Sequence, residues 1–298
     1  MQSSDPQQGP AVVDIPTAPS IKEGLQRFAN DGIPFVVRSL AALDMSYDEF
    51  KERAKMQRWT ICGWDRKQDM VSDVLVAGAL EDWEKDELQL NFFGDNTIPK
   101  FASNEAIHQD LLDVGLNENR FMLVLSNKGA YTPFHQDPIG DTNGAGFMWL
   151  LRGVKRWNFL SWERSISIFN HETKSLDDVP TENLVRLDNN KLWGKLMKVT
   201  IRAGDFLFVP PACSHRVWTD EPSIGVTGYI RRPEDEERRC KAVGWYKTVG
   251  LDPELGVWFP GAIRKQLKPF AAAEHTWLSY LEPEYHKCNS EKCEARTE

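Results

Sequence analysis

The chain has 298 residues, 41% of them hydrophobic, including 11 Trp and 15 Phe, so it can bury the core of one large domain or two small ones. Its formal net charge of −8 argues against direct nucleic-acid binding and favours basic partners. Five scattered cysteines argue against a disulfide framework and indicate a reducing compartment.

The sequence shows no targeting or membrane segment. The N-terminus lacks the basic segment and apolar run of a signal peptide, and no stretch approaches the roughly 18 apolar residues of a membrane span. We therefore expect an intracellular protein, in the nucleus or the cytoplasm, with no membrane association.

The first 118 residues divide into a tail and a segment of mixed character. Residues 1–20 are rich in Pro, Ser, Gln and Asp and predict a flexible tail. Residues 21–118 predict an α/β segment that packs on the core. Within it, helical spacing over 21–29 is followed by a strand over 34–37, and Ser46 opens a capping box for a second helix.

From residue 119 to 232 the sequence changes to short apolar runs separated by Gly and Pro. Many short strands with this punctuation predict a jelly roll or barrel. Arg152-Gly153 is expected to form a turn between two strands, and residues 163–195 a polar loop insert. The fold class is therefore mainly β with flanking helices (α+β). The expected strands cover 121–125, 147–151, 155–160, 197–201, 206–209 and 225–230.

Residues 233–298 predict a helical C-terminal segment. Two arginine pairs flank an acidic run over 231–239, a pattern typical of a solvated helix. Apolar residues at helical spacing follow over 263–271 and 277–281. We expect these helices to pack on the β core or on a second subunit, which would give a homodimer.

The stretch YTPFHQD, which ends at Asp137, contains a His-x-Asp pair at an expected strand end. Residues two apart in a strand point to the same side, so His135 and Asp137 can converge on one point while Gln136 faces away. An imidazole and a carboxylate suit a divalent transition metal, and a second histidine completes a facial triad with open positions. His215, which follows a rigid apolar run, is the candidate for that ligand.

Three stretches resemble the JmjC (Jumonji) domain and come in that family's order. They are YTPFHQD from Tyr131, LRGVKRW from Leu151 and AGDFLFVPPACSH from Ala203 to His215. The resemblance covers about residues 121–232. It implies a double-stranded β-helix, which is a cupin-like jelly roll, with Fe(II) as the metal and 2-oxoglutarate and O2 as cosubstrates.

The resemblance also implies a role for each matching residue. His135, Asp137 and His215 would be the catalytic Fe(II) ligands, leaving two positions for the keto-acid end of 2-oxoglutarate and one for O2. Lys155 stands where the family has a lysine that binds the distal carboxylate, which would otherwise be a desolvated charge. Thr132 is the matching hydroxyl donor. Without the resemblance, Lys155 would be interpreted as a solvated lysine at a strand end.

The implied reaction is oxidative decarboxylation of 2-oxoglutarate to succinate and CO2, coupled to hydroxylation of a C–H bond in a protein substrate such as a basic, histone-like peptide. Met148 departs from the family's histone demethylases, which carry a tyrosine seven positions before the lysine. This departure favours a protein hydroxylase over a histone lysine demethylase. The sequence is also compatible with a small-molecule oxygenase, a catalytically silent JmjC-fold binding protein or a metal-binding cupin without 2-oxoglutarate.

The remaining cysteines and histidines give weaker signals. Cys240, His286, Cys288 and Cys293 could be drawn into a zinc site, but their spacing matches no strong zinc pattern. Cys213 is interpreted as a small buried residue beside a metal-bearing strand rather than as a nucleophile.

Overall fold

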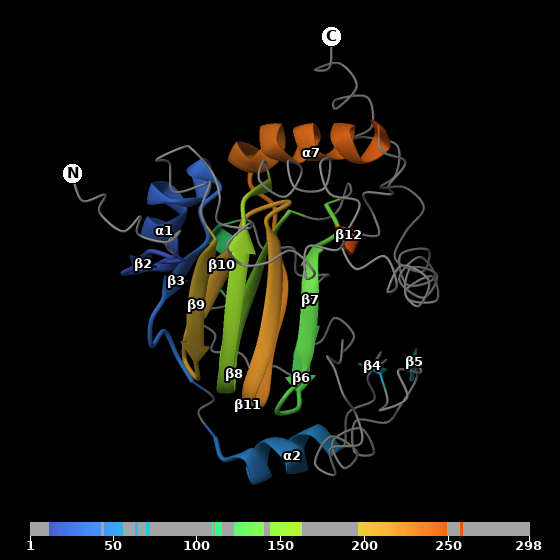
Figure 1. Cartoon of the computed structure of the whole chain (residues 1–298). Helices are drawn as coiled ribbons and strands as arrows, with labels where there is room; N and C mark the ends of the chain where they lie inside the picture. The colour runs from blue at the N-terminus through green and yellow to red at the C-terminus, as the bar shows by residue number, and fades with distance from the viewer. Residues whose placement is uncertain are drawn as a thin grey trace, which may run out of the picture.

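Figure 1 shows the computed structural model of the chain, which describes residues 12–42, 45–55, 63–64, 70–71, 109, 111–114, 122–139, 144–162, 196–248 and 257–258. Within these residues more of the chain lies in strands than in helices, and ten of the described strands form one curled, mixed sheet. The prediction of a mainly β fold is confirmed at this level.

Two long antiparallel strands, β8 (Ala145–Leu160) and β11 (Ser214–Ile230), form the centre of the sheet and pair from one end to the other. Every residue over 145–151 is buried. Alternate side chains of this run belong to two different apolar clusters, because both faces of the strand are covered. A strand that is covered on both faces requires apolar side chains at successive positions, rather than at every second position.

The expected turn at Arg152-Gly153 is wrong. Both residues lie inside β8, where Gly153 has a positive φ of 88°. The register with β11 shifts near Glu221 on the opposite strand, so the pair is kinked here but does not reverse. A Cβ at position 153 would lie 2.5 Å from the carbonyl oxygen of Pro222, so both the backbone conformation and the close approach require glycine.

The other strands extend the sheet on both sides of this pair. The order is β12-β7-β11-β8-β10-β3-β2, with β6 paired to β11 and β9 joining β8 to β1. Strand pairs β1–β9 and β2–β3 are parallel, and β4 and β5 form a separate two-stranded ladder. The bounds are β1 Val13–Asp14, β2 Thr17–Ala18, β3 Phe35–Val37, β4 Gly63–Trp64, β5 Met70–Val71, β6 Met122–Ser126, β7 Tyr131–Gln136, β9 Met197–Arg202, β10 Phe206–Val209 and β12 Val257–Trp258.

The prediction of a flexible tail over residues 1–20 is wrong for residues 12–20, and residues 1–11 lie outside the described part of the chain. Strands β1 and β2 add this segment to the sheet, and Ile15 and Ala18 are buried. The prediction followed the mostly polar composition of the segment, although its few apolar side chains anchor it to the sheet.

Both helices near the N-terminus begin directly after a serine cap, which the sequence predicted for the second helix at Ser46. Helix α1 (Ile21–Arg27) has Ser20 as its N-cap, whose hydroxyl oxygen accepts a hydrogen bond from the backbone N–H of Glu23. The 3-10 turn η1 (Ala29–Asp31) follows α1. Helix α2 (Tyr47–Lys55) opens at Ser46 in the same way.

Helix α7 (Glu236–Thr248) follows the 3-10 turn η4 (Pro233–Asp235) and lies across one end of the sheet (Figure 1). The expectation of a solvated helix here is wrong in one respect, because Arg239 is only 2% exposed. Its apolar residues pack in one cluster with side chains from β7 and β8. The predicted homodimer through the C-terminal helices stays a prediction, as do the segment boundaries at residues 119 and 233.

In the described part of the chain, no helix combines the length and the apolarity that membrane crossing requires. Several expected features lie outside the described residues, namely the loop insert over 163–195, the helices over 263–271 and 277–281, and the side chains of His286, Cys288 and Cys293.

Candidate metal centre

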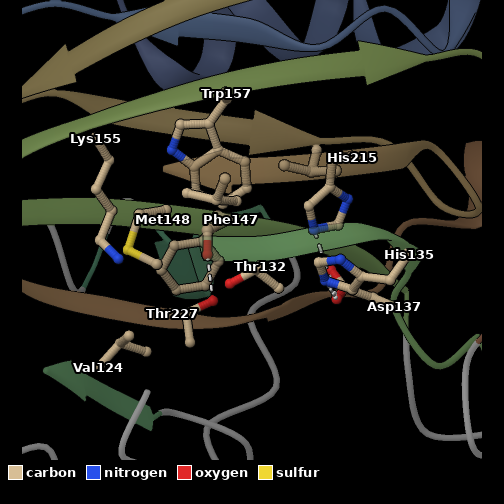
Figure 2. A pocket seen from close by; sticks show the side chains of 12 residues that line it. Val124, Thr132, His135, Asp137, Phe147, Met148, Lys155, Trp157, His215 and Thr227 are labelled. Carbon is tan, nitrogen blue, oxygen red and sulfur yellow. Dashed lines mark hydrogen bonds and ion pairs between the residues drawn. The ribbon is translucent and has the colours of Figure 1, made fainter. Parts of the chain in front are cut away.

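Strand pairing brings the three predicted metal ligands to one place. His135 near the end of β7 lies directly opposite His215 near the start of β11, and Asp137 follows the last residue of β7. One ligand atom from each of the three residues lies within 4.8 Å of the other two. Asp137 Oδ1 is 3.6 Å from His135 Nε2 and 3.8 Å from His215 Nε2 (Figure 2). Two imidazoles and one carboxylate therefore converge as a facial triad would.

The backbone orients the His215 ring. Its Nδ1 lies 3.0 Å from the carbonyl oxygen of Cys213, and the tautomer with the proton on Nδ1 donates to that oxygen. Nε2 then keeps its lone pair and faces Asp137. Burial, together with the nearby His135, lowers the pKa of His215 to about 4. The ring is thus neutral at physiological pH, which is the form that binds a metal.

Asp137 is held as a carboxylate. Burial alone would raise its pKa, but the adjacent His215 and His135 outweigh that effect and leave the pKa below its usual value. Gly146 on β8 makes room for this group, since a Cβ there would lie 3.0 Å from Asp137 Oδ2. The cluster thus offers the neutral ring of His215 and the negatively charged carboxylate of Asp137, with the ring of His135 beside them.

The triad forms one end of a pocket, and Lys155 forms the other (Figure 2). Lys155 on β8 pairs with Thr219 on β11, four residues beyond His215. Four residues of extended strand span roughly 13 Å. The walls between the two ends are mostly apolar. The lining comprises Val124, Thr132, His135, Asp137, Phe147, Met148, Lys155, Trp157, Val209, His215, Val217 and Thr227.

Lys155 is 3% exposed, and hydroxyl groups are its partners among the described residues. Its Nζ donates to Ser126 Oγ at 2.7 Å and to Thr219 Oγ1 at 3.4 Å. No carboxylate of the described residues forms an ion pair with it. Burial lowers the pKa of Lys155 to about 7. The interpretation of Lys155 as a solvated strand-end lysine is therefore wrong.

Thr132 reaches the pocket because β7 contains an irregularity. His135 pairs with His215, but Thr132 pairs with Val217, so three steps on β7 match two steps on β11. The extra residue of such a bulge returns Thr132 to the face that carries His135, whereas strict alternation would place it on the opposite face. Pro133, which has no N–H for the ladder, lies within the irregular stretch.

Trp157 is a pocket residue that the sequence reasoning missed. Its side chain lies between Lys155 and His215 in Figure 2, with its ring centroid 5.3 Å from that of His215. The buried indole Nε1 has no hydrogen-bond partner within the described part of the chain. Its place two residues after Lys155 on one strand could have revealed that it shares the lysine's face. Ser126 could not be found in this way, because only the pairing of β6 with β11 brings it near.

Neither Cys213 nor Cys240 belongs to the His-Asp-His cluster. Cys240 lies on α7 with its Sγ near Glu236 Oε1, and Cys213 is buried with its Sγ near the carbonyl oxygen of Leu160. The remaining members of the possible zinc site lie outside the described residues.

No protein-family model matches the chain, and a search of curated proteins finds no similar sequence. The geometry of the site is therefore the basis on which a function can be proposed.

Proposed function

We propose that this chain is an Fe(II)- and 2-oxoglutarate-dependent oxygenase of the JmjC type, and that its curled sheet is the core of a double-stranded β-helix. One observation carries the proposal. A His-Asp-His cluster lies at one end of a pocket, and at the other end lies a buried lysine that has no counter-ion among the described residues.

The donor set fits ferrous iron. Two histidine nitrogens and one carboxylate oxygen on one side of a metal are the ligands typical of non-haem Fe(II) oxygenases, and they leave the other side open. His135, Asp137 and His215 would hold the ion. When bound, Fe(II) with 2-oxoglutarate and O2 supplies the oxidising power for hydroxylation and yields succinate and CO2.

The other end of the pocket fits a carboxylate. A buried ammonium without an ion pair is costly, and an incoming carboxylate would both neutralise it and accept its hydrogen bonds. Thr132 and the buried Nε1 of Trp157 are two further donors along the same pocket. The strand positions of His215 and Thr219 are roughly 13 Å apart. A five-carbon diacid would fill this distance together with the side chains that reach into the pocket from its two ends.

We propose a protein substrate and a stable hydroxylated product. Met148, which lines the pocket, is an apolar residue at the position where the family's histone demethylases carry a tyrosine. The net charge of −8 is compatible with a basic peptide. Mass spectrometry of peptides after reaction separates the outcomes, since hydroxylation adds one oxygen atom and demethylation releases formaldehyde.

The activity test is succinate formation from 2-oxoglutarate with Fe(II), ascorbate and O2, screened against peptide pools and cell-extract metabolites. His135→Ala and Asp137→Ala are expected to abolish turnover, while Gly244→Ala, where a Cβ meets open space, keeps it. Turnover that survives in either ligand variant would contradict the proposal. No turnover by the wild-type protein with any substrate would favour a silent binding protein.

A further inference from the structure

We infer that Gln136, Ser214 and Tyr246 are positioning residues for the metal centre, and that helix α7 fixes the metal ligands through them. The inference rests on the proposed metal site but concerns side chains on the other face of the ligand strands. None of the three was assigned a role by the sequence.

Gln136 joins the two strands that carry the ligands. It lies between His135 and Asp137, so its side chain points away from the metal pocket, and it is fully buried. Its Nε2 donates to Ser214 Oγ at 2.8 Å, and Ser214 directly precedes His215. One side-chain hydrogen bond therefore ties β7 to β11 within one residue of each ligand.

Tyr246 of α7 completes this link. Its hydroxyl donates to Gln136 Oε1, and the phenol is fully buried. Burial raises the pKa of Tyr246, so the hydroxyl keeps its proton and remains a donor. Because Oε1 accepts from Tyr246, the amide of Gln136 is oriented with Nε2 toward Ser214.

A second contact from α7 lies on the other side of Asp137. Arg239 Nη1 donates to the carbonyl oxygen of Ile139 at 3.3 Å, while Arg239 Nη2 and Nε bind Glu236 at 2.6 and 3.1 Å. Helix α7 thus holds the chain at residue 136 and at residue 139. Asp137, which follows the last residue of its strand, depends on these two contacts for its position.

The physical consequence is a pre-organised ligand set. A metal gains full affinity only when its ligands already point at it, and outer residues that orient ligands are typically worth 10- to 100-fold in metal affinity. Loss of the Tyr246 hydroxyl leaves the Gln136 amide unfixed, and loss of the amide removes the side-chain link between the two ligand strands. Neither change removes a metal ligand.

The test is titration of the metal-free protein with Co(II), whose visible absorption reports ligand number and geometry. Tyr246→Phe and Gln136→Met are expected to weaken Co(II) binding 10- to 100-fold and to alter the Co(II) spectrum. If Tyr246 acts through Gln136, the double variant binds no more weakly than Gln136→Met alone.

The matched control is Trp149→Phe, which also removes a hydrogen bond, from Nε1 to the carbonyl oxygen of Ala41, at a residue that does not line the metal pocket. Thermal unfolding of each metal-free variant measures its loss of stability. Equal Co(II) affinity in Tyr246→Phe and Trp149→Phe at similar stability overturns the inference. A wild-type protein that binds no Co(II) overturns the proposed metal centre as well, so the two failures are distinguishable.

Discussion

Lys155 carries its ammonium group into a pocket in which hydroxyl oxygens are its only partners among the described residues. Below a pH of about 7 the folded protein bears the cost of this buried charge. Between pH 7 and the ordinary pKa of 10.5 the unfolded chain binds more protons at this site than the folded chain. The contribution of Lys155 to stability therefore rises with pH across that range.

The same proton governs the binding of an anion. A carboxylate binds the ammonium form, so the affinity for 2-oxoglutarate is expected to fall above pH 7, approaching about tenfold per pH unit. Calorimetric titration with Mn(II) present, from pH 6 to pH 8.5, measures this slope. Lys155→Arg keeps its charge throughout and should flatten the profile. An identical slope in both proteins would remove Lys155 from the binding site.

Gly146 shows how little space the Asp137 carboxylate has. In Gly146→Ala the new methyl group would lie 3.0 Å from Asp137 Oδ2 and push the carboxylate away by a few tenths of an ångström. We expect metal affinity to fall about tenfold, as measured by Mn(II) titration.

Gly244→Ala is the control for this change. Its Cβ meets no atom within 4 Å, and alanine is favoured inside a helix by up to about 1 kcal/mol. It should therefore bind Mn(II) as the wild type does. If the two alanine variants bind Mn(II) equally, the position of Asp137 does not depend on Gly146.

At the scale of single residues, the sequence predicted the ligand pair because the period of a strand is local. His135 and Asp137 are two positions apart in the sequence, and side chains two positions apart in a strand point to the same face of the sheet. The same rule would have placed Thr132 on the wrong face, and only the resemblance assigned it to the pocket. The irregular register between β7 and β11 depends on the partner strand, which the local pattern does not contain.

At the scale of elements, β8 and β11 are each one long kinked strand, where the sequence predicted shorter ones. Glycine is ambiguous in such a pattern, because a turn and a kink both use its positive φ. The distinction depends on whether the next segment pairs with the same partner strand. Here the segments on both sides of Gly153 pair with β11.

The kink gives a prediction about stability. Gly153→Ala forces alanine into a positive φ and brings its Cβ to 2.5 Å from the Pro222 oxygen on β11. Gly129→Ala has a similar φ of 85° but no atom within 4 Å of its Cβ. The backbone cost, about 1–2 kcal/mol, is common to both variants.

Urea unfolding should therefore show a larger loss of free energy in Gly153→Ala than in Gly129→Ala. The difference isolates the contact between the two long strands. Equal losses in the two variants would mean that the strands separate at the kink without cost.

At the scale of the whole molecule, the sheet brings together residues that no local pattern connects. Ser126 and Thr219 reach Lys155 from β6 and β11, and Tyr246 reaches the ligand strands from α7. The mainly β class was predictable from the frequency of short apolar runs. The order of the strands was not, because it depends on pairings between segments far apart in the chain, such as β1 with β9.

The most direct test of the central claim is a crystal structure of the protein soaked with Mn(II) and N-oxalylglycine, a non-reactive analogue of 2-oxoglutarate. We predict an anomalous peak for Mn(II) bound by His135, Asp137 and His215, with the distal carboxylate of the analogue about 3 Å from Lys155 Nζ. Manganese bound elsewhere, or an analogue whose distal carboxylate lies away from Lys155, would contradict the account.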